Sequence, residues 1–144
     1  MLKKFGMESC TPSTTHLPAG INLSVDDCPA NDKKEKGMKK VLYQEALGSL
    51  MWLQVATRPD LFYLVNILFC FTHNPGKQHW IALKHMLSYI KDTTNYGIIY
   101  RAGESLNPIG YMNVDFVGCK ETRKLTEENI FIVAGGPVSW KSKR

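Results

Sequence analysis

Apolar residues recur at helical spacing from residue 39 onward. A stripe with intervals of four, four and three predicts a helix over residues 40–57. Pro59 ends this helix, because the residue before a proline, Arg58, is pushed out of the α region. The stripe and the residues that widen it are Leu42, Ala46, Leu47, Leu50, Met51 and Leu53.

Two further helices follow. Pro59 suits a first helical turn and Asp60 suits the positive end of a helix dipole, so a second helix is predicted over residues 59–73. Residues 61–71 are almost entirely apolar, which is typical of a helix that is buried on nearly every side. The run 73–76 (HNPG) ends it, and a third helix is predicted over residues 77–91. Its apolar face is Trp80, Leu83, Met86, Leu87 and Ile90.

The pattern changes to strands after residue 96. Short strands are predicted at residues 97–100, 106–116, 129–134 and 138–140, with turns at 102–105 and 135–137 and a polar loop at 117–128. The fold class predicted is therefore α+β, with three helices followed by an incomplete antiparallel β meander. Two or three such strands are marginal by themselves and leave an open edge, so they look like the beginning of a domain.

Residues 1–38 lack a regular pattern. Prolines and charged residues predict an extended polar tether, docked at most through residues 21–23. The chain is thus divided into a tether (1–38), a helical region (39–95) and a strand region (96–144).

Composition narrows the class of protein. The chain has 144 residues, is 44% hydrophobic and carries a net charge of +5, which suits nucleic acid as a partner. It contains neither a signal peptide nor an apolar run long enough for a membrane span, so an intracellular location, cytoplasm or nucleus, is expected, with no membrane partner and no small-molecule substrate. The four cysteines are read as unpaired thiols and His79 and His85 as helix-surface residues, so no metal site is predicted.

Six blocks of the sequence together resemble one family, the copia-type retrotransposon Gag-Pol polyproteins. They are residues 2–8 (LKKFGME), 43–53 (YQEALGSLMWL), 56–61 (ATRPDL), 74–84 (NPGKQHWIALK), 87–93 (LSYIKDT) and 135–143 (GGPVSWKSK). The blocks occur in the family's order and spacing over essentially the whole chain. The resemblance implies that residues 39–95 correspond to the thumb and connecting region at the end of reverse transcriptase, and that residues from 96 open a ribonuclease H-like domain.

The resemblance also identifies a site. In the intact family enzyme, carboxylates hold Mg²⁺ ions for cleavage of an RNA–DNA hybrid, and the first of them falls on Asn113 of this chain. An amide is neutral and offers one oxygen, so this position is weakened as a ligand. Asp115 matches a second Asp of the block and is a weak candidate. The remaining carboxylates of the family would follow Lys143, so this chain is predicted not to be an enzyme and to need no cofactor of its own.

Binding of nucleic acid needs only positive charge within reach. The candidate residues are Lys39, Lys40, Arg123, Lys124, Lys141, Lys143 and Arg144, and the alternative is a solvated surface. Four aromatic residues on helical faces are predicted to be core rather than base-stacking platforms: Tyr43, Trp52, Phe62 and Trp80.

The sequence is therefore compatible with three functions. The first is an inactive remnant of a Pol polyprotein that binds RNA–DNA hybrid or other nucleic acid weakly, or packs against the rest of the polyprotein. The second is an excerpt of an active polyprotein. The third is a repurposed helical module that binds another protein.

Overall fold

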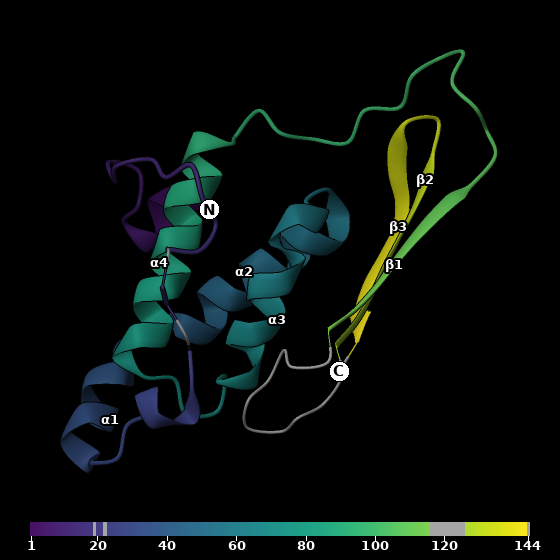
Figure 1. Cartoon of the computed structure of the whole chain (residues 1–144). Coiled ribbons are helices and arrows are strands. Elements are labelled where there is room, and N and C mark those ends of the chain that lie inside the picture. The colour runs from purple at the N-terminus through teal and green to yellow at the C-terminus, as the bar shows by residue number, and fades with distance from the viewer. Residues whose placement is uncertain (19, 22, 116–125, 144) are drawn as a thin grey trace.

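A bundle of helices is followed by a three-stranded antiparallel sheet (Figure 1). The computed structural model describes residues 1–18, 20–21, 23–115 and 126–143, of which 32–34, 114–115, 126 and 142–143 are described by their backbone alone. The α+β class predicted from the sequence is confirmed. The ribonuclease H-like type of the sheet stays a prediction.

All three predicted helices are present. They are α2 (Tyr43–Ala56), α3 (Phe62–Cys70), which follows the 3-10 turn η3 (Pro59–Leu61), and α4 (Lys77–Asp92). Helix α3 ends three residues earlier than predicted, because Phe71 leaves the helical conformation at φ −100° and ψ 12°.

The core lies between these helices, and the face that α2 buries differs from the predicted stripe. Tyr43 begins the buried face and Gln54 ends it, whereas Leu42 is exposed. The core consists of Tyr43, Ala46, Leu47, Leu50, Leu61, Leu64, Val65, Leu68, Ala82, Leu83, Met86, Leu87 and Ile90.

Two predictions about aromatic residues and histidines were wrong. Trp52 was expected in the core but is 76% exposed. His79 was expected on the surface but is fully buried: its ring stacks on Phe71 with centroids 4.0 Å apart, and its Nδ1 accepts a hydrogen bond from Gly76 N–H at 2.8 Å. A histidine in the first helical turn can satisfy a terminal N–H, and sequence spacing alone does not reveal this role.

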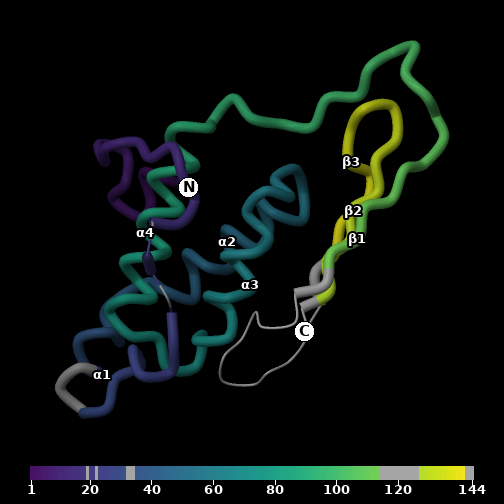
Figure 2. The backbone as a smooth tube through the Cα atoms, viewed as in Figure 1, coloured from purple at the N-terminus to yellow at the C-terminus, as the bar shows by residue number. Residues whose placement is uncertain are grey.

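The N-terminal segment contains more structure than the predicted tether. It forms η1 (Leu2–Phe5), η2 (Val25–Asp27) and α1 (Asp32–Met38), and the polar run of α1 is supported by an i,i+4 ion pair between Glu35 and Lys39 at 2.8 Å. The segment runs along α4 (Figure 2), where Lys91 Nζ donates to Cys10 O at 2.6 Å. Leu23, in the segment predicted to dock, packs against the core, as do Leu2, Phe5, Met7 and Leu17. The division of the chain into three domains stays a prediction.

The sheet has the order β1 (Ile109–Asp115), β2 (Thr126–Val133), β3 (Gly136–Lys143), with both pairs antiparallel. Residues 126–128, predicted as loop, are strand because they pair with residues 113–115. The strand predicted at 97–100 is absent. This segment instead passes the β2–β3 turn, where Arg101 N–H donates to Ala134 O at 2.9 Å and Ala134 N–H donates to Ser105 O at 3.0 Å, without forming a ladder.

The sheet is attached to the helices through Trp140, whose Nε1–H donates to the backbone carbonyl of Gln54 in α2 at 3.0 Å. The chain between α4 and β1 makes a long excursion (Figure 2) before the sheet returns beside the helices. Among the helices in the described part of the chain, none has both the length and the apolar character needed to cross a membrane.

Candidate functional site

The residues that the resemblance placed at an active site lie on β1. Asn113 is exposed and pairs across the sheet with Glu128 of β2, which in turn pairs with Ser142 of β3. Cross-strand partners have Cβ atoms about 5 Å apart, so the amide and the carboxylate stand side by side on one face. Asp115 pairs with Thr126, and its side chain lies outside the described part of the structure.

These residues do not fit the Mg²⁺ pair that the intact family enzyme uses. Magnesium demands an octahedral set of oxygen ligands, in which carboxylates supply the charge. Asn113 offers one neutral oxygen at the position of the first ligand. In the described residues, His, Cys, Asp and Glu side chains nowhere gather in a group of three that could hold a metal ion. We therefore derive no metal-dependent step for this chain.

The predicted nucleic-acid-binding residues are not all brought together. Lys39 and Lys40 are exposed at the end of α1, and Lys141 is exposed on β3, which lies on the other side of the helical bundle (Figure 1). Lys39 is bound to Glu35, and this contact lowers the pKa of the Glu35 carboxyl through the hydrogen bond and the charge of the lysine. Arg123, Lys124 and Arg144 lie outside the described residues, as does the side chain of Lys143.

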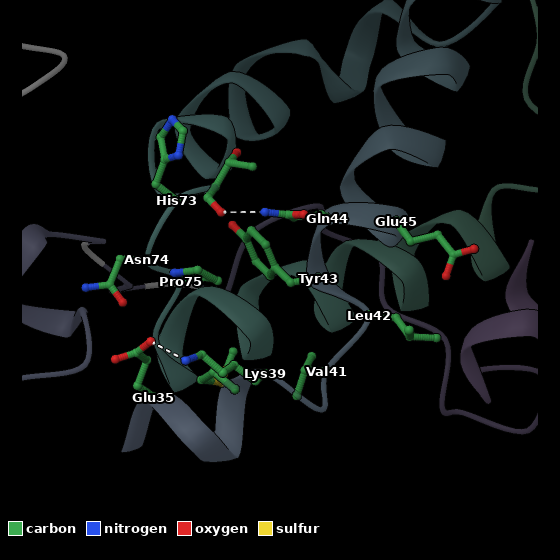
Figure 3. A pocket seen from close by; sticks show the side chains of 12 residues that line it. Glu35, Lys39, Val41, Leu42, Tyr43, Gln44, Glu45, His73, Asn74 and Pro75 are labelled. Atoms are coloured by element: carbon green, nitrogen blue, oxygen red, sulfur yellow. Dashed lines mark hydrogen bonds and ion pairs between the residues drawn. The ribbon is translucent and has the colours of Figure 1, made fainter. Parts of the chain in front are cut away.

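A hollow of about 400 Å³ opens where α1, the beginning of α2 and the loop after α3 meet (Figure 3). Gln44 Nε2 donates across it to Thr72 O at 3.3 Å, and the Glu35–Lys39 ion pair stands at its lower side in the figure. Tyr43 forms one wall, and its hydroxyl donates to Leu68 O at 2.8 Å. Burial raises the pKa of this phenol, with smaller contributions from Cys28 and Cys70.

Most of the polar side chains described in this hollow are bonded to other groups of the protein, which does not favour a reactive site. Lys39 pairs with Glu35, the second carboxylate of the hollow, Glu45, pairs with Lys4, and the Gln44 amide and the phenol of Tyr43 are each bonded to a backbone carbonyl. A buried phenol with a raised pKa stays protonated near neutral pH, so Tyr43 acts as a hydrogen-bond donor that holds α2 to the end of α3. We read the hollow as a packing feature between three segments.

The most elaborate polar cluster surrounds Arg58, which is 4% exposed. Its guanidinium donates twice to Asp60, from Nε to Oδ1 at 2.9 Å and from Nη2 to Oδ2 at 2.8 Å. It also donates to Thr93 at the end of α4, from Nη1 to the backbone oxygen at 3.0 Å and from Nη2 to Oγ1 at 2.7 Å. The rings of Tyr89 and Tyr96 lie 5.6 and 5.5 Å from the guanidinium carbon, within the range of a cation–π contact.

The ionisable groups of the cluster stabilise one another in the charge states that they have at neutral pH. Burial acts to raise the pKa of Asp60, but the hydrogen bond and charge of Arg58 outweigh it and lower the pKa. Burial and the hydrogen bond to Asp60 at 3.0 Å raise the pKa of Tyr89. The hydrogen bond to Asp60 raises the pKa of Arg58 against the opposing effect of burial. Every one of these shifts favours the form found in the cluster at neutral pH.

Sequence reasoning identified the blocks that contain this cluster, residues 56–61 and 87–93, but not the contact between them. The blocks are separated by more than two dozen residues, and a fully buried arginine is rare enough that it is not expected from composition. The usable signal was the presence of Arg and Asp beside a proline that forces the turn. That signal cannot predict Thr93 or Tyr96 as partners of Arg58, because only the packing of α4 brings them close to it.

The chain resembles proteins of transposons. No family model and no solved structure matches it. It is 36% identical over 143 residues to the retrovirus-related Pol polyprotein from transposon TNT 1-94 of Nicotiana tabacum, covering 99% of this chain and 11% of that protein. It is 33% identical over 145 residues to the Pol polyprotein from transposon RE1 of Arabidopsis thaliana, covering 9% of that protein.

A third relative is much shorter. The secreted RxLR effector protein 161 of Plasmopara viticola is 40% identical over 107 residues, which make up 74% of this chain and 75% of that protein. The chain thus spans about a tenth of the Pol polyproteins and three quarters of the short relative. With matches to the Pol polyproteins along its whole length, the chain belongs to the family of retrovirus-related Pol polyproteins of copia-type transposons.

Proposed function

We propose that this chain is a non-catalytic structural joint of a copia-type Pol polyprotein, where the end of the reverse transcriptase passes into the beginning of the ribonuclease H region. The observation that carries the proposal is the Arg58 cluster. It ties the turn between α2 and α3 to the end of α4, at the point where the chain leaves the helices for the sheet. Its polar groups bind one another, which suits a role in fixing the point where the chain leaves the helices, while Trp140 attaches the sheet to α2.

The joint can be tested by following the two parts separately during unfolding. Urea unfolding is monitored by circular dichroism at 222 nm for the helices, and by the fluorine signal of 5-fluorotryptophan at Trp140 for the sheet. Coupled parts unfold with coincident midpoints. We expect coincidence in the wild-type chain and separated midpoints in Arg58→Met. Separate midpoints already in the wild type would contradict the joint.

The absence of catalysis is part of the proposal and rests on Asn113. A neutral amide at the first ligand position lowers the negative charge that would hold the metal ions. The test incubates the chain with a labelled RNA–DNA hybrid in Mg²⁺, beside Asn113→Ala. We expect no cleavage above buffer in either sample. Cleavage by the wild-type chain that disappears in Asn113→Ala would show that the site works.

Weak, charge-driven contact with nucleic acid is a further component. Lys141 is exposed on β3 and offers a positive charge to a phosphate. Contacts of this kind weaken steeply with salt, because phosphates release counterions on binding. In fluorescence anisotropy with the same hybrid, we expect affinity to fall between about 50 and 200 mM salt, and further in Lys141→Gln. Equal binding by wild type and Lys141→Gln at all salt concentrations would remove β3 from the interface.

A second candidate function is favoured by one observation, the exposed apolar face of α2. Trp52 and Val55 are 76% and 63% exposed, and a hollow beside Trp52 is bordered by Met1 and Leu53. Such a face fits packing against another polypeptide, and the similarity to a short protein named as a secreted effector supports this second reading. Sedimentation of wild type and Trp52→Ser distinguishes the readings: a self-associating face loses association in the variant, whereas a joint that only packs internally does not change.

A further inference from the structure

The face of the sheet that carries Trp140 forms a second hollow, of about 220 Å³, against the beginning of α3. Strand alternation and the cross-strand register place Tyr111, Glu128, Ile130 and Trp140 on this face. Phe62 borders the hollow from the helical side. The hollow therefore has aromatic walls from two different parts of the fold.

One of its walls is fixed in place. Trp140 is half-buried, and its Nε1–H donates to the backbone carbonyl of Gln54 at 3.0 Å, so the orientation of the indole is set before any ligand arrives. A ring that is held beforehand loses less freedom when a ligand binds. Tyr111 is 57% exposed, which leaves the opposite wall accessible from solvent.

Among the residues that border the hollow, Asn113 and Glu128 are direct cross-strand partners and place an amide and a carboxylate on this face, whereas Asn129 is in register with Met112 on the opposite face. Within the described part of the chain, Glu128 forms no ion pair. Lys141 also borders the hollow, but it is in register with Asn129 and Met112, so its side chain belongs to the opposite face of the sheet. The charge that the described side chains present inside is therefore negative.

Aromatic faces combined with a carboxylate are complementary to a cation. The electron-rich faces of Trp and Tyr attract an ammonium or guanidinium group, and a guanidinium can also lie flat on a ring while it donates to a carboxylate. Drug-sized ligands occupy roughly 300 to 1,000 Å³, so a hollow of 220 Å³ is suited to one side chain rather than to a larger molecule. A nucleic-acid strand fits less well, because its phosphates would approach Glu128.

We propose that this hollow, between Trp140, Tyr111 and Phe62 with Glu128 as counter-ion, is a docking site for an arginine side chain of another polypeptide. The proposal does not rest on the Arg58 cluster of the structural joint, although the hollow shares Trp140 with the contact between the sheet and α2 and is also bordered by Lys141. The proposal also gives Asn113 a role. Because its amide is neutral, Glu128 is the member of this cross-strand pair that carries the negative charge.

The test is a titration of the full chain with the peptide acetyl-Gly-Arg-Gly-amide, followed by the ¹H–¹⁵N signals of the tryptophan indoles. The control peptide carries citrulline, which has the shape of arginine without its charge. We expect the Trp140 signal to shift and saturate with a dissociation constant on the order of 1 mM. Trp52, which is more exposed but has no such surroundings, reports nonspecific contact and should not shift.

Two adjacent residues of β2 provide a matched pair of variants. Glu127 and Glu128 carry the same charge but point to opposite faces of the sheet. Glu128→Gln should weaken binding by about tenfold, whereas Glu127→Gln should leave it within about twofold. Tyr111→Ala, at an exposed position, should weaken binding about threefold and serves if Glu128→Gln disturbs the fold.

Several outcomes would overturn the proposal. They are an equal response to the citrulline peptide, a parallel shift of Trp52, equal losses in the two glutamine variants, and an unmoved Trp140 signal at saturating peptide. Cytidine monophosphate provides the remaining arm: if it shifts Trp140 more strongly than the arginine peptide does, the hollow takes a nucleobase instead.

Discussion

Removal of the Arg58 guanidinium tests the central contact of this fold. In Arg58→Met the apolar stem is replaced by a side chain of similar length, while all four hydrogen bonds to Asp60 and Thr93 are lost. The Asp60 side chain is 37% exposed, so water hydrates its carboxylate when the guanidinium is removed. The free energy lost with the Arg58–Asp60 ion pair is therefore reduced by solvent screening. Thr93 is 2% exposed, so its carbonyl loses the arginine donor inside the protein.

The magnitude follows from these two terms. Bonds between charged groups contribute about 1.5 to 3 kcal/mol, reduced here by the exposure of Asp60, and a buried carbonyl deprived of its donor costs about 1 to 3 kcal/mol. We expect a loss of about 3 kcal/mol in the free energy of unfolding of the helical part, equivalent to roughly 10 °C in its Tm. Arg58→Lys should lose about half as much, because lysine keeps the charge but cannot donate from a planar fork.

Urea unfolding monitored by circular dichroism measures the change, and Arg101→Met is the matched control. Arg101 is exposed, so its replacement should change stability by no more than about 0.5 kcal/mol. If Arg58→Met remains within that range, or if Arg101→Met costs as much, the cluster does not hold the fold together and the reasoning is refuted.

The same cluster predicts a dependence on pH. Arg58 lowers the pKa of Asp60 below its ordinary value of 3.8, so the carboxylate is stabilised in the folded state relative to the unfolded state. Its contribution is fully present above the ordinary value and is lost as the pH falls through the lower, folded-state pKa. The difference in stability between wild type and Arg58→Met should therefore shrink as the pH falls below 3.8. A difference that is unchanged in strong acid would assign the effect of Arg58 to its hydrogen bonds with Thr93 and to packing, rather than to Asp60.

Two further substitutions test other contacts. A Cβ on Gly76 would stand 1.7 Å from the backbone oxygen of Asp27, so Gly76→Ala should lower the free energy of unfolding by about 1 to 3 kcal/mol, measured by urea unfolding. Gly48→Ala, which meets open space on exposed α2, is its control and should stabilise the helix by about 0.5 to 1 kcal/mol; equal losses in both would point to backbone effects unrelated to the contact. Trp140→Phe removes the donor to Gln54 O and should cost about 1 kcal/mol by the same assay, with no change if the sheet and helices are independent.

Sequence patterns predicted the extent of the helices well because Pro59 and the run at residues 73–76 mark where helices end. The boundaries of α2 and α4 fell within a few residues of the prediction, and Pro59 ended the first helix as expected. The prediction of which side of a helix faces the core was less accurate. On α2, apolar residues occur on every side, so periodicity could not decide between Leu42 and Tyr43 as the inner residue, nor place Trp52 outside.

The polar segments were harder to predict for a different physical reason. Helix α1 is mostly charged, and an ion pair between Glu35 and Lys39 supports it. Arg58 is a polar residue in the interior whose hydrogen-bond partner Thr93 only the fold brings near, and the buried ring of His79 stacks on Phe71. Such partners follow from tertiary packing, so a local pattern cannot reveal them.

At the candidate site, the position of the residue in the fold was predicted from the sequence, but its neighbour was not. Asn113 was located correctly on a strand, because alternation and turn signals are local, and its neighbour Glu128 could not be named before the register was known. Asn113 is exposed, and substitutions at exposed positions usually change stability by less than about 0.5 kcal/mol. Folding therefore constrains Arg58 and Gly76 strongly and Asn113 hardly at all. A chain whose function were only to hold its neighbours together could replace an acidic residue on β1 by an amide without weakening its fold, whereas the same exchange at Asp60 would remove the negative partner of a buried guanidinium.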